Sequence, residues 1–276
     1  MSQNQIFNMQ RFGLLINHDV RENWRKILLS LGGLLGALII IGLFYAVTNF
    51  QGADDIDPEW LRHIGERMAL TEVIFFTIIM FFAGAYVAST AFKSFSSAPS
   101  ALSSIMIPAS QFEKFMVKWL VAVPCFFIIY VAFAMFADWV RVAFIDMNYH
   151  VEVSTFDWNK LFFHSEEIAF KHFSLIGIMT FFCVQSFFLL GSIVWPRVSF
   201  LKTFVSLFAL GLVYGWFDFW FYDLLEKPDT MFVAPEWLEN GDMVATLVVL
   251  ALTVLSLFNY CLTFMRFREA ETIVRW

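Results

Sequence analysis

Four ionisable side chains lie within or beside long apolar stretches, and these are the residues most suited to a functional role in the sequence. Glu72 lies one turn into the second stretch, and Asp218 lies late in the fifth. Charge inside a bilayer is costly, so such residues are rare and often functional. Asp138 and Arg141 close the third stretch and are three residues apart, a spacing that favours an ion pair at the interface. Glu72 and Asp218 are therefore the candidates for contact with a substrate.

Other chemistry has little support. His164, Glu167 and His172 could hold a metal ion, but such residues more often form a solvated face, and no metal site is assigned. The three cysteines lie in apolar stretches without CxxC spacing, which is typical of small buried residues: Cys125, Cys183 and Cys261. No GxSxG, HExxH or paired intramembrane aspartates occur, so no catalytic residue is assigned and an enzyme is not expected.

Long apolar stretches must position these residues. The chain of 276 residues is 59% hydrophobic and only 15% charged, whereas soluble domains carry about 25% charge. A helix of about 20 apolar residues spans the roughly 30 Å hydrocarbon core. Six stretches are long enough: 27–50, 68–92, 115–140, 172–195, 200–224 and 243–265. We therefore expect an all-α integral membrane protein with six transmembrane helices. One or two short extracytoplasmic helices are expected in the connection 148–171, and a short extracytoplasmic cap in 226–242.

Basic residues predict the orientation. With the N-terminus inside, twelve Lys and Arg lie in inner segments and six in outer ones. Both ends are therefore expected in the cytoplasm, in a basic inner face that suits anionic membrane lipid. We expect a single transmembrane domain over 1–276, made of a cytoplasmic N-terminus (1–26), a six-helix membrane domain (27–265) and a cytoplasmic tail (266–276). Nothing indicates nucleic-acid binding.

The segment 6–25 predicts an amphipathic helix in the plane of the membrane interface. Phe12, Ile16, Val20 and Trp24 recur at i, i+4 spacing, with basic residues on other faces. An ordinary cytoplasmic tail is the alternative. Glycine pairs at GxxxG spacing occur in the first and fifth stretches, and each could pack within the chain or against a second subunit: Gly32 with Gly36, and Gly211 with Gly215.

The cytoplasmic connection 93–114 is rich in serine and ends in PASQFEK. Ser110 and Glu113 form a capping box, in which the serine hydroxyl accepts from the Glu113 N–H and the carboxylate reaches back to the Ser110 N–H. On physical grounds this predicts a helix that begins here and runs through Lys118 into the third stretch.

The same residues carry a resemblance. The stretch 108–118 resembles the P-x-S-x-x-E-x-x-x-x-K/R pattern of ABC-2 type permeases, with Pro108, Ser110, Glu113 and Lys118 in the corresponding positions. The six spans, the N-terminal amphipathic helix and the lack of a nucleotide-binding domain also resemble that family. The long outer connection after the third stretch departs from it.

The resemblance implies a membrane subunit of a bacterial ABC transporter, an exporter of the cytoplasmic (inner) membrane. It implies a coupling helix that docks on a separate ATPase subunit, formed here by Phe95, Ser96, Ser97, Ser100, Ala101, Leu102, Ser103, Ser104 and Ile105. A second permease copy, identical or related, would complete the transporter. This chain would bind no cofactor, and ATP and Mg would bind the ATPase. A non-transporting membrane scaffold or sensor subunit is the alternative.

Overall fold

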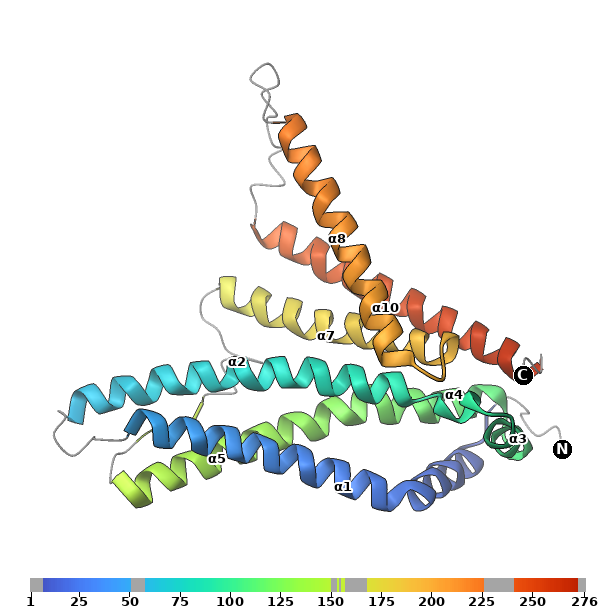
Figure 1. Cartoon of the computed structure of the whole chain (residues 1–276), viewed down its shortest axis with the longest axis horizontal. Helices are drawn as coiled ribbons and strands as arrows, with labels where there is room; N and C mark the ends of the chain where they lie inside the picture. Colours follow the sequence, from blue (N-terminus) through green and yellow to red (C-terminus); the bar gives the residue numbers. More distant parts are fainter. Residues whose placement is uncertain are drawn as a thin grey trace. The chain divides into compact units, whose positions relative to one another are not determined.

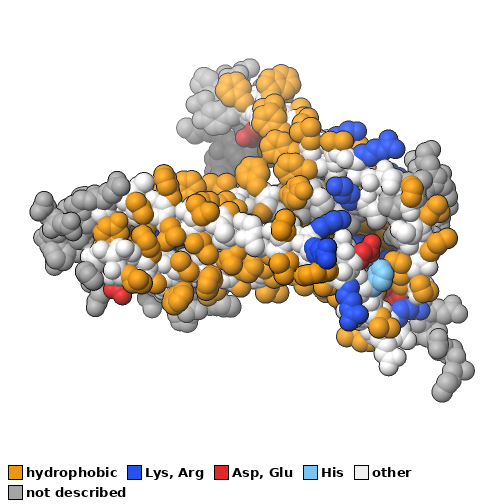
Figure 2. Space-filling view, turned by 60° about the horizontal axis from the view of Figure 1, so that its bottom comes forward, with side chains coloured by type: hydrophobic (Ala, Val, Ile, Leu, Met, Phe, Trp, Pro, Cys, Tyr) orange, Lys and Arg blue, Asp and Glu red, His pale blue; other side chains and the backbone are white. Residues whose placement is uncertain are grey.

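The computed structural model describes residues 7–50, 58–149, 153, 155–156, 168–225 and 241–272. Within these ranges the chain is helical and contains no strand. Six helices are long and apolar enough to cross a membrane, and Figure 2 shows hydrophobic side chains distributed along the helix surface. The all-α fold expected from the sequence is thus confirmed for the described residues, with the six predicted helices of membrane-spanning length.

The chain divides into two compact units, which are described separately. One unit comprises Met1–Gly84 and Ala109–Lys160, and the other comprises Ala85–Pro108 and Leu161–Trp276. Helix α2 (Pro58–Thr90) contributes residues to both. Its first residue is Pro58, a favoured residue at this position because the proline ring presets the helical φ angle.

The first unit is built around α1 (Met9–Phe50), which packs along α5 (Phe126–Tyr149) and whose N-terminal part reaches α4 (Gln111–Leu120). The ribbon of α1 bends between its N-terminal part and the remainder, but the helix is continuous (Figure 1). The predicted amphipathic segment and the first apolar stretch therefore form one helix of 42 residues.

A single turn of π-helix, Val121–Cys125, joins α4 to α5. Pro124 lies within this turn. Proline lacks the N–H of an α-helical hydrogen bond and its ring crowds the preceding carbonyl, so the helix accommodates it with a wider turn. The result is one helical run, Gln111–Tyr149, that is long and apolar enough to cross a membrane.

Side chains from α1, α2 and α5 form the core of the first unit. Ala46, Phe50, Met68 and Ile145 make a buried apolar cluster. The Tyr130 hydroxyl donates a 2.6 Å hydrogen bond to the carbonyl of Phe76 on α2. This bond satisfies a phenolic O–H that would otherwise be buried without a partner.

The second unit contains the short helices η2 (Lys93–Ser96) and α3 (Ala98–Met106) and three long ones: α7 (Ile168–Val194), α8 (Ser199–Leu225) and α10 (Gly241–Thr272). Helices α7 and α10 pack along each other, and Asn259 on α10 donates to the Ser186 hydroxyl on α7 at 3.0 Å. Such polar contacts between buried helices hold membrane bundles together.

Helix α8 contacts α7 near its beginning and then diverges from α7 and α10 (Figure 1). At the contact, Gly191 on α7 faces Thr203 on α8 so closely that an added Cβ would clash with the threonine hydroxyl. Further along, every residue from 208 to 221 is exposed. In a membrane this apolar surface would face lipid or another protein chain.

The cysteines differ in their surroundings. All three are free thiols; Cys183 is buried, Cys125 is partly buried and Cys261 is exposed on α10. The prediction of burial was therefore wrong for Cys261. Hydropathy places a residue in an apolar helix, but it cannot distinguish a side that faces a neighbouring helix from a side that faces lipid.

Candidate functional site

Glu113, in the first turn of α4, is completely buried and accepts four hydrogen bonds. One comes from the backbone N–H of Ser110 at 2.9 Å, while the Ser110 hydroxyl accepts from the Glu113 N–H at 3.2 Å. The predicted capping box is confirmed. A carboxylate at this position also interacts favourably with the positive end of the helix dipole.

The other bonds to Glu113 come from the N-terminal segment of the chain. Arg11 binds both carboxylate oxygens, with Nε at 2.7 Å and Nη2 at 2.8 Å. The Asn8 backbone N–H donates to the same carboxylate at 2.7 Å, and the Asn8 side chain caps α1 by accepting from the Gln10 N–H. Phe7 packs edge-on against Phe112. The beginning of α1 is thus bound to the beginning of α4.

A second ion pair joins the same two helices. Lys118 Nζ lies 2.5 Å from Asp19 Oδ1, and both side chains are partly exposed. We call Arg11, Asp19, Glu113 and Lys118 the clasp. Two of its members, Glu113 and Lys118, belong to the motif that the sequence singled out, whereas their partners carry no local signal because they lie about a hundred residues away.

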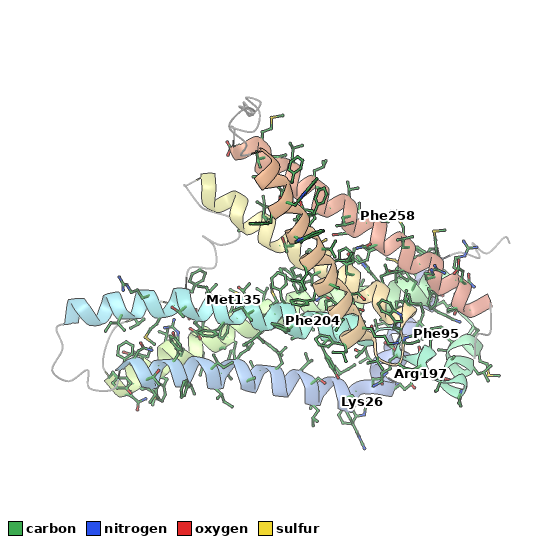
Figure 3. The ribbon with its side chains drawn as sticks, turned by 45° about the horizontal axis from the view of Figure 1, so that its top comes forward. Lys26, Phe95, Met135, Arg197, Phe204 and Phe258 are labelled. Carbon is green, nitrogen blue, oxygen red and sulfur yellow. The ribbon has the colours of Figure 1, made fainter. Side chains whose placement is uncertain are left out.

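The predicted coupling segment lies in the second unit as η2 and α3. Arg197 donates to the Ser96 carbonyl at 3.3 Å, and Phe95 packs edge-on against Phe267 of α10 (Figure 3). On α3, Ala101 is buried while Leu102 and Ser103 are exposed. The side chains of Ser100, Ser104 and Ile105 lie outside the described residues, as does the side chain of Ala98. Ser97 precedes α3 as its N-cap residue, and Pro108 is exposed before α4.

A cluster of three ionisable residues is buried between α2 and α5; we call it the Arg141 cluster. Arg141 Nη2 lies 2.6 Å from Asp138 Oδ1, so the predicted pair forms. Arg141 Nε also lies 2.5 Å from Glu72 Oε2 on α2. All three side chains are at most 2% exposed, so the cluster is buried inside the protein.

Helix α1 closes one side of the Arg141 cluster through Gly42. A Cβ at this position would lie 2.6 Å from Glu72 Oε1 and 3.7 Å from the Arg141 Cβ. Asp138 uses its second oxygen to accept from the Phe156 N–H at 2.9 Å, which ties the segment after α5 to the cluster. Only glycine leaves room for the Glu72 carboxylate against α1.

The Arg141 cluster has one guanidinium for two carboxylates. When all three ionise, the cluster carries one net negative charge. Arg141 lies eight residues, or about 12 Å, before the end of α5, and Gly42 lies the same distance before the end of α1. A charge cluster buried between these helices is a candidate for contact with a polar substrate or for a structural lock between helices.

The remaining predicted residues lie apart from both clusters. Asp218 is exposed on α8, in the second unit. A Cβ added at Gly32, Gly36, Gly211 or Gly215 would meet no described atom within 4 Å. Packing of these glycines against other described parts of the chain is therefore not observed, and the surfaces around them are open.

The residues considered as metal ligands lie outside the part of the chain whose side chains the structure describes. His164, Glu167 and the side chain of His172 lie outside the described residues, as do most of 148–171 and 226–240. No group of three or more His, Cys, Asp or Glu that could hold a metal ion occurs in the part of the chain that the structure describes.

Comparisons with known protein families, with characterised proteins and with solved structures found no match for this chain. The proposed function therefore rests on the residues of this chain and on their contacts.

Proposed function

We propose that the chain is the membrane-spanning permease subunit of an ATP-binding-cassette exporter of the ABC-2 type. It would cross the bacterial cytoplasmic membrane six times with both ends inside. A separate ATPase subunit would bind ATP and Mg, and a second permease copy or a related chain would complete the pathway. The six apolar helices support the membrane part of this proposal.

The observation that carries the proposal is the arrangement around the motif 108–118. Ser110, Glu113 and Lys118 each have a defined role: the first two form the capping box, and the last two bind the N-terminal part of α1. A capping box alone would need neither the Arg11–Glu113 pair, in which only Glu113 is buried, nor the Lys118–Asp19 pair. The clasp joins the N-terminal part of α1 to α4, so the two helices would move together if an ATPase displaced either of them.

The segment between α2 and α4 has properties suited to docking. It contains a short helix, α3, whose Leu102 and Met106 are exposed, and its start is held by Arg197 and Phe267 in the same unit. A displacement of α3 by an ATPase would be transmitted to α2 through η2 and to α4 through residues 107–110, because these short segments link the helices in the chain. We assign no catalytic residue to this chain, whose work would be conformational.

Substrate contact is proposed for Glu72 and Asp218. Glu72 is held in the Arg141 cluster, so a polar group of a cargo would compete with Arg141 for it. Asp218 is exposed on an apolar helix, where a bare carboxylate would be costly against lipid. A second chain or a cargo at α8 would remove that cost.

One observation favours the alternative, a membrane scaffold or sensor that assembles through its helix faces. The glycines at 32, 36, 211 and 215 are open, which allows close approach of another helix. The two functions differ in whether an ATPase binds and responds.

The test is a matched pair of substitutions. Met106 at the end of α3 and Met147 near the end of α5 are 80% and 79% exposed. The chain is purified from its own cells in mild detergent, and co-purifying proteins with a P-loop are identified and assayed for ATP hydrolysis. We expect an ATPase to co-purify, Met106→Glu to abolish its association or coupling, and Met147→Glu to leave both unchanged. Purification without an ATPase, or equal effects of both variants, would contradict the proposal and favour the scaffold.

A further inference from the structure

The exposed face of α1 just before its apolar stretch combines cations with large apolar side chains. Arg21 and Arg25 are four residues apart, as are Trp24 and Leu28 in the adjacent row, and all four are exposed. Residues at this spacing lie on the same side of a helix. Lys26, which follows Arg25 and lies on the next side of the helix, is exposed as well, and Figure 3 shows its side chain extending away from α1.

These three cations have no ion-pair partner in the described part of the chain. The nearby acids are engaged elsewhere: Asp19 pairs with Lys118, and Glu22 faces His18 at 3.9 Å. Arg25 lies over the ring of Trp24 at 5.6 Å, which leaves the guanidinium edges available. The face therefore presents positive charge that the described residues do not neutralise.

The position of the face along α1 matches the depth of lipid headgroups. The apolar stretch from residue 27 to Phe50 is 24 residues, or about 36 Å, slightly more than the roughly 30 Å hydrocarbon core. Arg21, Arg25 and Lys26 lie within two turns of its start. Tryptophan and long cations are the residues that favour this layer, since each has an apolar body and a polar end.

We propose that Arg21, Arg25 and Lys26 form a binding surface for anionic phospholipids. Trp24 and Leu28 would insert beneath the headgroups, where the acyl chains begin. Charge complementarity selects a phosphate-bearing anion. The exposed Trp24 and Leu28 select a lipid over a soluble acidic partner, because only a lipid offers an apolar layer beside its phosphate.

The clasp prepares this surface. The Arg11–Glu113 and Lys118–Asp19 pairs hold the N-terminal part of α1 against α4, so the helix backbone that carries the three cations does not have to be ordered when lipid binds. A preorganised site loses less entropy on binding. This inference stands apart from the proposed transport function, because it needs neither an ATPase nor a cargo.

The experiment is a lipid titration of the full-length protein in detergent, followed by native mass spectrometry, with phosphatidylglycerol and phosphatidylcholine as the probes. The variant Arg21→Gln/Arg25→Gln/Lys26→Gln is compared with Arg67→Gln/Lys202→Gln/Arg266→Gln, which removes the same charge from exposed positions elsewhere. With roughly five-fold per cation, we expect the first variant to lose on the order of a hundred-fold in phosphatidylglycerol affinity and little in phosphatidylcholine affinity. The second should retain the preference of the unmodified protein.

A charge-preserving variant, a folding control and a soluble competitor complete the experiment. Arg21→Lys/Arg25→Lys preserves charge and should retain most of the preference, and a thermal unfolding curve verifies that each variant is folded. Equal losses in both triple variants would show general charge attraction and overturn the proposal, as would a lack of preference for phosphatidylglycerol. Soluble polyglutamate that binds more tightly than the lipid, and is lost in the first variant, would indicate an acidic protein partner and overturn it as well.

Discussion

Gly36 and Gly42 occupy the same helix, and both are in its apolar part, yet their surroundings differ. An added Cβ at Gly36 meets open space, whereas one at Gly42 meets the Glu72 carboxylate at 2.6 Å. The carboxylate cannot simply move away, because Arg141 holds it and the cluster is buried. At the scale of single residues, the effect of a methyl group depends on what stands opposite.

Gly42→Ala is therefore expected to destabilise the protein, while Gly36→Ala should be neutral or slightly stabilising. Alanine favours a helix by up to about 1 kcal/mol relative to glycine. At Gly42 this gain is outweighed by overpacking, which costs about 1–3 kcal/mol, and by disturbance of a buried ion pair. Thermal unfolding of the purified variants in the same detergent measures the difference. A Gly42→Ala variant as stable as Gly36→Ala would contradict the close packing around Glu72.

At the scale of helices, the clasp joins α1 to α4 through two ion pairs with partly exposed cations, of which only the Arg11 pair has a buried carboxylate, Glu113. The two ion pairs differ in how much they are expected to stabilise the contact between the helices. Exposed pairs contribute little, because water and salt screen them. Glu113 is completely buried and accepts bonds from Arg11, Asn8 and Ser110, so removing its charge leaves several donors poorly matched.

Glu113→Gln is expected to loosen the N-terminal part of α1. Hydrogen bonds to charged groups contribute about 1.5–3 kcal/mol, so amide hydrogen exchange in residues 9–20 should accelerate roughly 10- to 100-fold. Hydrogen-exchange mass spectrometry of the full chain measures this. The matched control is Glu269→Gln, which removes an exposed carboxylate paired with Arg266 and should leave exchange in α1 unchanged. Unchanged exchange in α1 of the Glu113 variant would mean that the clasp does not hold that segment.

At the scale of the whole molecule, orientation rests on the distribution of basic residues. The described structure supplies exposed positions that test it: Gln10 at the beginning of α1 and Asn148 near the end of α5. These positions are expected on opposite sides of the membrane.

We expect Asn148→Cys to react with a membrane-impermeant maleimide in intact cells, and Gln10→Cys to react only after the cells are opened. The three native cysteines are first replaced by serine, since Cys261 is exposed and would add background. The single-cysteine chains are then compared by gel shift. The opposite labelling pattern would invert the topology and move η2 and α3 to the outer side, away from any cytoplasmic ATPase.

The sequence alone was sufficient for the properties that depend on neighbouring residues. Apolar runs predicted six helices of membrane-spanning length, because the backbone hydrogen bonds of a helix form within the segment itself. The Ser110–Glu113 capping box was predictable for the same reason, since its members are three residues apart. The Asp138–Arg141 pair also follows from local spacing.

Only the tertiary structure decided which distant residues meet. Nothing in the spacing links Arg11 to Glu113 or Glu72 to Arg141, because these contacts depend on the angle and register at which separate helices pack. Burial was equally hidden: Cys183 and Cys261 lie in similarly apolar helices, yet one is buried and the other exposed. Lipid acyl chains are as apolar as the protein interior. Hydropathy therefore distinguishes a membrane segment from a water-exposed one, but not the protein core from the lipid-facing surface.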